Sequence, residues 1–261
     1  METVTHAGRE VAYRRTGDGD SPVLYVHGAG GDHRLWVEQY APNGVGPAVA
    51  LDLTGHGESD DADLDSGTET LDAYARDVLA VASETGAATL VGNSMGGAVA
   101  LWAVLEHGFD PEALVLCGTG AKLAVGDELL SMFDGEFDAA LETLAAPNLL
   151  FHDPDGGVVA RTTAAFHETG QAVTTRDFRT CDTFDVRDRL DEVDVPALAI
   201  TGEHDGMTPP SFTEYLGREL PDCEVTLIDD CAHLSMLERP VVWNERVRTF
   251  LGKELHRVPD S

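Results

Sequence analysis

The amino-acid sequence predicts an α/β fold, a mostly parallel, doubly wound sheet that carries one helical insertion. Short runs of continuously apolar residues recur along the chain, and segments with apolar residues every three or four positions separate them. Strands that are apolar throughout are typical of parallel sheets, because helices cover both faces. One long interval, residues 119–194, contains no strand-like run, although a crossover between parallel strands needs far fewer residues.

The predicted strands are short apolar runs bounded by Gly, Pro or Asp. They lie at 9–15, 21–28, 47–53, 87–92, 112–118, 195–202 and 223–230. Helical periodicity fills most of the chain between and after them, at 68–86, 97–108, 210–220 and 240–255. The alternation predicts parallel neighbouring strands joined by helices on the faces of the sheet.

The long interval without strands has helical patterns of its own, at 127–133, 135–151, 156–170 and 175–181. Helices inserted after the carboxyl end of a strand would cover the edge at which open α/β sheets bind ligands. We therefore expect a core formed by residues 1–118 and 187–261, with residues 119–186 as a helical lid.

The charge balance is strongly acidic. The chain has 17 basic and 47 acidic residues, a net charge of −30, and its only lysines are Lys122 and Lys253. Such a surface repels nucleic acids and anionic membranes. Abundant acidic residues with almost no lysine resemble proteins from salt-accumulating microbes, so we expect a halophilic protein stabilised when salt screens its self-repulsion.

The sequence shows neither the pattern of a targeting segment nor the cysteine spacing of a metal site. The sequence has no run of 18 apolar residues, and the first ten residues lack the basic and apolar regions of a signal peptide, which favours a cytoplasmic protein. The four cysteines, Cys117, Cys181, Cys223 and Cys231, lack the spacing of a zinc site. Gly-x-Gly-x-x-Gly and Walker spacings are also missing, so we expect neither a metal nor a nucleotide cofactor.

The segment LVGNSMGGAVALW, residues 90–102, places Ser94 between Gly92 and Gly96 where a predicted strand becomes a predicted helix. A serine at such a junction lies on a tight turn that lifts its hydroxyl clear of the sheet, and glycines on both sides leave room in the crowded corner. An ordinary glycine-rich turn would contain the same motif. The interpretation therefore depends on partners for the serine.

A serine hydroxyl becomes a useful nucleophile when a histidine accepts its proton and a carboxylate orients that histidine. Asp205 follows the strand-like run 195–202, and His233 follows the run 223–230. The carboxyl ends of parallel strands meet at one edge of a sheet, so both side chains can reach Ser94 there. The order Ser, Asp, His along the chain is the order found in hydrolases with a nucleophile elbow.

With these features the chain resembles the α/β-hydrolase superfamily, and within it the compact members with a helical lid. The matching motifs are HGAGG at 27–31, DLTGHGESD at 52–60, GNSMGG at 92–97, TGEHDGMTPP at 201–210 and AHLSMLERP at 232–240. These motifs extend over nearly the whole predicted core, whereas the predicted lid has no motif that we can match. The core is similar to that of esterases, enol-lactonases and carbon–carbon bond hydrolases.

The resemblance implies a role for each motif residue. Ser94 would attack a carbonyl carbon, His233 would act as general base, and Asp205 would stabilise the imidazolium. The backbone N–H groups of Ala29 and Met95 would form the oxyanion hole. The resemblance implies no metal and no organic cofactor.

Some neighbouring residues have competing interpretations. Glu203, Asp229 or Asp230 could orient the histidine instead of Asp205, although the turn TGEHD resembles the family turn in which the later acid faces the histidine. His27 and His56 lie in loops that the resemblance assigns to structural roles. Within the predicted lid, basic residues could meet a polar substrate group or face solvent, namely His152, His167, Arg161, Arg176 and Arg179.

The sequence therefore predicts a serine hydrolase that cleaves a small ester or lactone through an acyl-enzyme on Ser94. The predicted lid is rich in Leu, Phe and Ala, which favours an apolar acyl group. Two alternatives stay open: the same residues could perform carbon–carbon bond hydrolysis or acyl transfer, or the scaffold could serve as a ligand-binding receptor without turnover. The sequence does not predict an oligomeric state.

Overall fold

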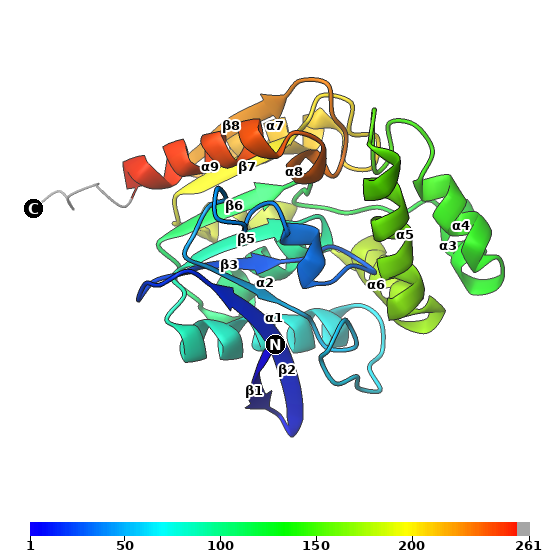
Figure 1. Ribbon diagram of the computed structural model, residues 1–261, viewed down its shortest axis with the longest axis horizontal. Helices are drawn as coiled ribbons and strands as arrows, with labels where there is room; N and C mark the ends of the chain where they lie inside the picture. Colours follow the sequence, from blue (N-terminus) through cyan, green and yellow to red (C-terminus); the bar gives the residue numbers. More distant parts are fainter. Residues whose placement is uncertain (255–261) are drawn as a thin grey trace, which may run out of the picture.

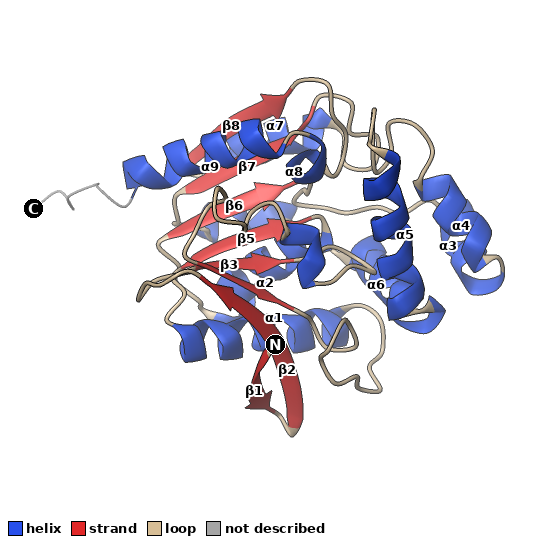
Figure 2. Ribbon diagram, in the orientation of Figure 1, coloured by secondary structure: helices blue, strands red, loops and turns tan. Residues whose placement is uncertain are grey.

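A computed structural model describes residues 1–254 of the chain. One eight-stranded sheet runs through the molecule in the order β1-β2-β4-β3-β5-β6-β7-β8 (Figures 1 and 2). The strands are β1 (Glu2–His6), β2 (Arg9–Thr16), β3 (Val23–Val26), β4 (Ala48–Leu51), β5 (Thr89–Asn93), β6 (Ala113–Cys117), β7 (Ala197–Gly202) and β8 (Cys223–Ile228). Pairing is antiparallel from β1 to β2 and from β2 to β4, and parallel across the rest. This architecture confirms the predicted α/β class.

Burial along the strands follows their place in the sheet. Every residue of β3, β4, β5, β6 and β7 is buried, which is why these strands have continuous apolar sequences. The edge strand β8 is more exposed, and Val225 and Leu227 reach solvent. The strand β1 was not predicted, because ETVTH is largely polar and exposed and its pairing with β2 is what defines it.

Helices cover both faces of the sheet. The buried core on one face is formed by α1 (Thr68–Thr85), α2 (Met95–His107) and α7 (Pro210–Glu219). The opposite face is covered by α9 (Pro240–Glu254), the short α8 (Ser235–Glu238) and the 3-10 helix η1 (His33–Trp36). A second 3-10 helix, η2 (Arg187–Glu192), precedes β7.

A helical insertion separates β6 from β7. It contains α3 (Asp127–Gly135), α4 (Phe137–Leu144), α5 (Gly156–Thr169) and α6 (Gln171–Thr183), which lie beside the carboxyl ends of the central strands (Figure 1). The helix predicted at 135–151 ends at Leu144, because Pro147 and a bridge from Pro147 to Phe151 interrupt it. The pattern at 175–181 belongs to the longer helix α6.

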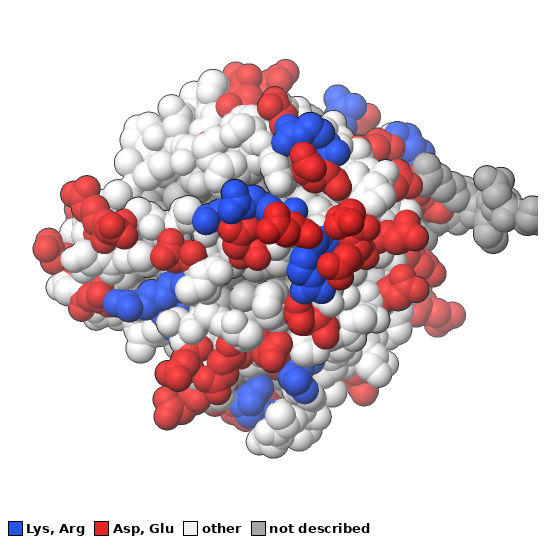
Figure 3. Space-filling view, turned by 180° about the vertical axis from the view of Figure 1, so that it is seen from behind, with Lys and Arg blue, Asp and Glu red and all other residues white. Residues whose placement is uncertain are grey.

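On the face of the molecule seen in Figure 3, acidic side chains are spread widely, with a few basic side chains among them. In the described part of the chain, no helix has both the length and the apolar character needed to cross a bilayer.

Candidate active site

Ser94 occupies the tight turn between β5 and α2 with φ 53° and ψ −117°, a conformation that residues with side chains rarely adopt. A methyl group on Gly92 would lie 2.3 Å from the carbonyl oxygen of Gly96, and one on Gly96 would lie 2.3 Å from that of Val26. Only glycine fits at either position. The chain thus maintains a strained backbone at a half-buried serine that lines a cavity, a feature that is common at functional sites.

His233 and Asp205 meet beyond the ends of β8 and β7. His233 Nδ1 lies 3.0 Å from Asp205 Oδ2, and both side chains are buried. Asp205 also accepts hydrogen bonds from the hydroxyl groups of Thr201 and Thr208, at 2.7 and 2.8 Å. Its second oxygen accepts the backbone N–H groups of Met207 and Thr208.

These contacts determine the charge of the carboxylate. Burial alone would raise the pKa of Asp205, but the charge and hydrogen bond of His233, with the hydrogen bonds of Thr201 and Thr208, hold this pKa below its ordinary value. A buried carboxylate that stays ionised can hold the Nδ1–H tautomer of His233 and leave Nε2 free to accept a proton.

The competing acids lie elsewhere. Glu203 accepts the backbone N–H of Asp230, and its Oε1 lies 3.3 Å from Nε2 of the neighbouring His204. Asp229 and Asp230 are exposed, and Asp230 pairs with Arg239. Among the described acidic residues, Asp205 is the one bonded to the imidazole of His233.

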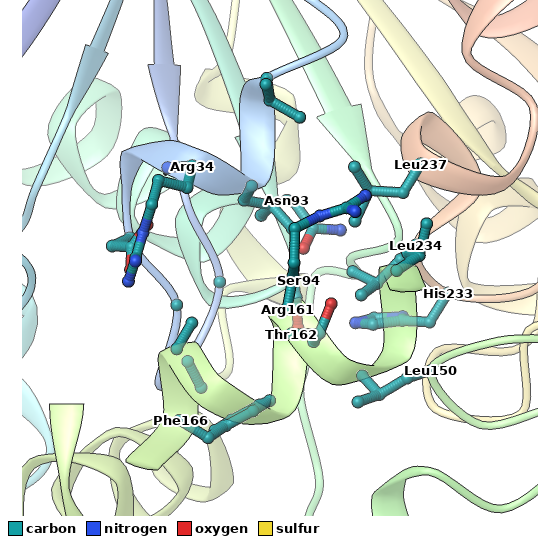
Figure 4. A pocket seen from close by; sticks show the side chains of 18 of the residues that line it. Arg34, Asn93, Ser94, Leu150, Arg161, Thr162, Phe166, His233, Leu234 and Leu237 are labelled. Carbon is teal, nitrogen blue, oxygen red and sulfur yellow. Dashed lines mark hydrogen bonds and ion pairs between the residues drawn. The ribbon is translucent and has the colours of Figure 1, made fainter. Parts of the chain in front are cut away.

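Ser94 and His233 line the same cavity, which has a volume of about 290 Å³ (Figure 4). In the described part of the chain, residues 1–254, no direct hydrogen bond joins the side chains of Ser94 and His233. Catalytic hydrogen bonds are often long in hydrolases without substrate and tighten when the reacting group binds. The structure thus brings the three predicted residues to one site.

The backbone around Ser94 offers two free donors. Met95 is the first residue of α2, so its N–H has no acceptor within the helix. Ala29 lies in the loop after β3 and lines the cavity together with Ser94. Neither N–H group has an acceptor in the part of the chain that the structure describes. Of these two unpaired donors, Ala29 belongs to the lining of the cavity and Met95 directly follows Ser94.

The histidines of the neighbouring loops are fully buried and packed together, with the ring centroids of His27 and His56 4.7 Å apart. His27 Nδ1 lies 2.8 Å from the carbonyl oxygen of Gly28, and its Nε2 accepts the N–H of Leu53. Burial and the nearby His56 lower the pKa of His27 to about 4, which keeps this ring neutral. Both histidines therefore have structural contacts.

The wall of the cavity is mostly apolar and comes from the core and the insertion. Its apolar side chains include Leu35, Val37, Leu150, Val158, Phe166, Phe178, Met207, Leu234 and Leu237. Phe166 contacts the cavity directly, so it forms part of the cavity wall as well as packing within the insertion. Arg161 of α5 lies at the wall of the cavity, exposed and without an ion pair to any described residue (Figure 4).

The other basic residues of the insertion have protein partners. Arg176 bonds to Asp61 and to backbone carbonyls of the core, and Arg179 pairs with Asp134. His152 stacks on His204, and His167 lies at the edge of Phe137 and near Asp138.

Asp177 of α6 is a residue that the sequence did not single out. It is fully buried and bonds to His56, Tyr74 and the backbone of Gly30. The sequence distance from Asp177 to Gly30 is 147 residues, and no local motif marks it. Asp177 is one of several charged residues in α6, so the composition of the helix does not mark it either.

One group of residues has the composition of a metal site. Ligand atoms of Asp32, His33 and Asp52 lie within 4.8 Å of one another. However, His33 Nδ1 and the His33 backbone N–H both bond to Asp52, and Asp32 binds Arg34. These hydrogen bonds already engage the atoms that would bind a metal ion, so the three residues stabilise the loop.

Residues 23–246 match the family model described as the alpha/beta hydrolase family. The chain is 27% identical to the pimeloyl-[acyl-carrier protein] methyl ester esterase of Neisseria meningitidis serogroup A, over 94% of this chain and 83% of that protein. It is also similar to a solved thermophilic esterase, with a TM-score of 0.86, 30% identity and 97% of each chain covered. An enol-lactonase from Burkholderia xenovorans superposes with a TM-score of 0.85 at 25% identity, over 96% of this chain and 100% of that one.

The fold, the nucleophile turn and the family match agree. The chain belongs to the alpha/beta hydrolase family and is a hydrolase with esterase-like relatives.

Proposed function

We propose that the protein is a serine esterase or lactonase that works through an acyl-enzyme. The observation that carries the proposal is that Ser94 and His233 line one largely apolar cavity, with the ionised Asp205 bonded to His233. The N–H groups of Ala29 and Met95, unpaired among the described residues, lie in the adjoining loop and turn. A strained backbone that holds a serine at the wall of a cavity has little use in a packing role.

The geometry supports a definite sequence of steps. His233 Nε2 takes the Ser94 proton as Oγ attacks the carbonyl carbon, and the resulting oxyanion accepts the N–H groups of Ala29 and Met95. His233 then gives the proton to the leaving alkoxide, which departs as an alcohol. Water, deprotonated by the same imidazole, attacks the acyl carbon. The bond from the acyl carbon to Ser94 Oγ then breaks, Oγ takes the proton from His233, and the carboxylic acid leaves.

The substrate is a small ester or lactone with an apolar acyl group. A cavity of about 290 Å³ lined mainly by Leu, Val, Phe and Met favours such a group over a highly charged one. Relatives named as a methyl ester esterase and an enol-lactonase act on carbonyl groups of this kind. The insertion, residues 119–186, acts as the lid over this cavity, and no metal or organic cofactor takes part.

The acidic surface completes the proposal. A protein of net charge −30 disfavours nucleic acid and anionic membranes as partners, and we place it in a salt-rich cytoplasm.

Purified protein, in multimolar KCl, is assayed with p-nitrophenyl esters of graded chain length and with a dienol ketone, and Ser94→Ala serves as the blank. We expect ester turnover to fall at least about 1,000-fold in Ser94→Ala. Turnover of the dienol ketone alone would indicate carbon–carbon bond hydrolysis. Ligand binding that survives in Ser94→Ala, with no fluorophosphonate labelling of the wild type, would favour a receptor.

A further inference from the structure

Gly30, the residue after the proposed oxyanion donor Ala29, is held by the helical insertion. Its N–H donates to Asp177 Oδ2 of α6 at 2.9 Å, and its carbonyl oxygen accepts the hydroxyl of Thr169, the last residue of α5, at 3.1 Å. Its φ of 64° and its approach to Phe166, whose ring would lie 2.3 Å from a methyl group there, require glycine. Both backbone polar groups of Gly30 are thus bonded to side chains from the insertion.

The carboxylate of Asp177 is itself fixed in place. Oδ1 accepts the hydroxyl of Tyr74 at 2.7 Å, and Oδ2 accepts His56 Nε2 at 2.8 Å in addition to Gly30. His56 Nδ1 faces the carbonyl oxygen of Thr54, so both nitrogens of this ring point at acceptors, as expected for an imidazolium. A buried ion pair with this many hydrogen bonds has one well-defined geometry.

Two further charged or titratable side chains, Arg176 and His27, face the pair of His56 and Asp177 without replacing any of its hydrogen bonds. Arg176 of the same helix lies close to the Tyr74 hydroxyl and the Thr54 carbonyl. His27 faces His56 from the core but keeps its own hydrogen bonds to Gly28 and Leu53. Asp177 therefore remains the acceptor for Gly30.

We propose that Asp177 and Thr169 are positioning residues for the oxyanion hole. By holding Gly30 at both its N–H and its C=O, they fix the loop 27–31 so that the N–H of Ala29 points into the cavity. The inference rests on the proposed function, because it assigns a task to the same hole. It extends that function, since the insertion now builds part of the catalytic site and does more than cover it.

A consequence concerns the order of events. When α5 and α6 lie against the core, the loop has its two anchors; when they move away, the Gly30 N–H and C=O lose both partners. Catalysis is then confined to the state in which the insertion is docked. A donor misplaced by about 1 Å can cost about 100-fold in rate.

The test compares Asp177→Asn and Thr169→Val with one control, Arg179→Gln, and with Tyr74→Phe, a milder change in the same network. Arg179→Gln removes an exposed ion pair from the same helix, two residues from Asp177. Tyr74→Phe removes a hydrogen bond from Asp177 at the oxygen that does not hold Gly30. Each variant is measured for kcat and KM with p-nitrophenyl butyrate, for inhibition by butylboronic acid, whose serine adduct mimics the tetrahedral intermediate, and for thermal unfolding. Fluorophosphonate titration counts the active sites.

We expect kcat per active site to fall about 10- to 100-fold in Asp177→Asn and about 3- to 10-fold in Thr169→Val, with KM within about threefold. Boronic acid inhibition should weaken in parallel, while Arg179→Gln stays at wild-type values. Tyr74→Phe frees only the oxygen that does not hold Gly30, so its kcat should fall less than that of Asp177→Asn. Thr169→Val carries the test if Asp177→Asn fails to fold.

The inference is overturned if both Asp177→Asn and Thr169→Val keep the wild-type kcat and boronic acid inhibition, or if Thr169→Val does so when Asp177→Asn is unfolded. In that case Ser94-dependent turnover of the wild type would still support the proposed function. A wild type with neither turnover nor labelling would overturn both.

Discussion

At the scale of single residues, position along the chain was the most informative signal. Ser94, Asp205 and His233 can be predicted because each follows a predicted strand, and the structure brings all three to one edge of the sheet. Asp177 could not be predicted in this way, because its partners come from α1 and from the loops after β3 and β4. Their meeting depends on how the insertion packs, which no local pattern encodes.

The role of Asp205 can be separated from that of its neighbour Glu203. Asp205→Asn keeps the shape but removes the charge that stabilises the imidazolium and fixes its tautomer. We expect kcat for p-nitrophenyl butyrate to fall by about 10³- to 10⁴-fold, whereas Glu203→Gln should stay within about threefold. The reverse pattern would assign the orienting role to Glu203.

The buried pair of His56 and Asp177 predicts a dependence of stability on pH. Burial would lower the pKa of His56, yet the charge and hydrogen bond of Asp177 raise it above its ordinary value. Burial would likewise raise the pKa of Asp177, but His56, Tyr74 and Gly30 hold it below. The stabilisation is therefore complete between about pH 3.9 and about pH 6.5, the ordinary pKa values of the two groups, and declines on either side.

His56→Gln tests this assignment. We expect its loss of unfolding free energy, relative to the wild type, to be larger at about pH 6 than at about pH 9, because the stabilisation from the raised pKa of His56 is complete below about pH 6.5 and declines above it. Urea unfolding at the two pH values measures the difference. An equal loss at both would show that His56 is neutral throughout.

At the scale of elements, the predicted strands at 9–15, 21–28 and 87–92 correspond to β2, β3 and β5. The insertion was less predictable. The sequence predicts its helices but not where they end. The helix predicted at 135–151 stops before Pro147, and α6 begins before the pattern predicted at 175–181. Tertiary contacts fix such ends, as they fix the polar strand β1.

The turn between β5 and α2 depends on close contact between backbones. Gly96→Ala would place a methyl group 2.3 Å from the Val26 carbonyl oxygen. Relieving this clash requires the backbone to shift, because the contacted atom belongs to the backbone. We expect a loss of about 1–3 kcal/mol or more in the free energy of unfolding, measured in urea. Gly135→Ala, at the end of α3 with no atom within 4 Å, should be neutral or stabilise by about 0.4–1 kcal/mol. Equal effects would contradict the account of this turn.

At the scale of the whole molecule, the acidic surface is the dominant feature. With 47 acidic and 17 basic residues, self-repulsion opposes folding until counter-ions screen it (Figure 3). The Debye length falls from about 10 Å at 0.1 M salt to about 3 Å at 1 M. We expect both the Tm and the ester turnover to rise between 0.1 M and about 2 M KCl. A Tm that stays constant or falls over this range would rule out adaptation to high salt.

The central claim, an acyl-enzyme on Ser94, has a direct measurement. Purified protein is mixed with excess p-nitrophenyl butyrate, quenched in acid during turnover, and analysed by intact-protein mass spectrometry and peptide mapping. We predict one butyryl group per chain, located on Ser94, absent from Ser94→Ala and accumulating with a burst of p-nitrophenol. Turnover without any adduct, or an adduct on another residue that persists in Ser94→Ala, would contradict the account.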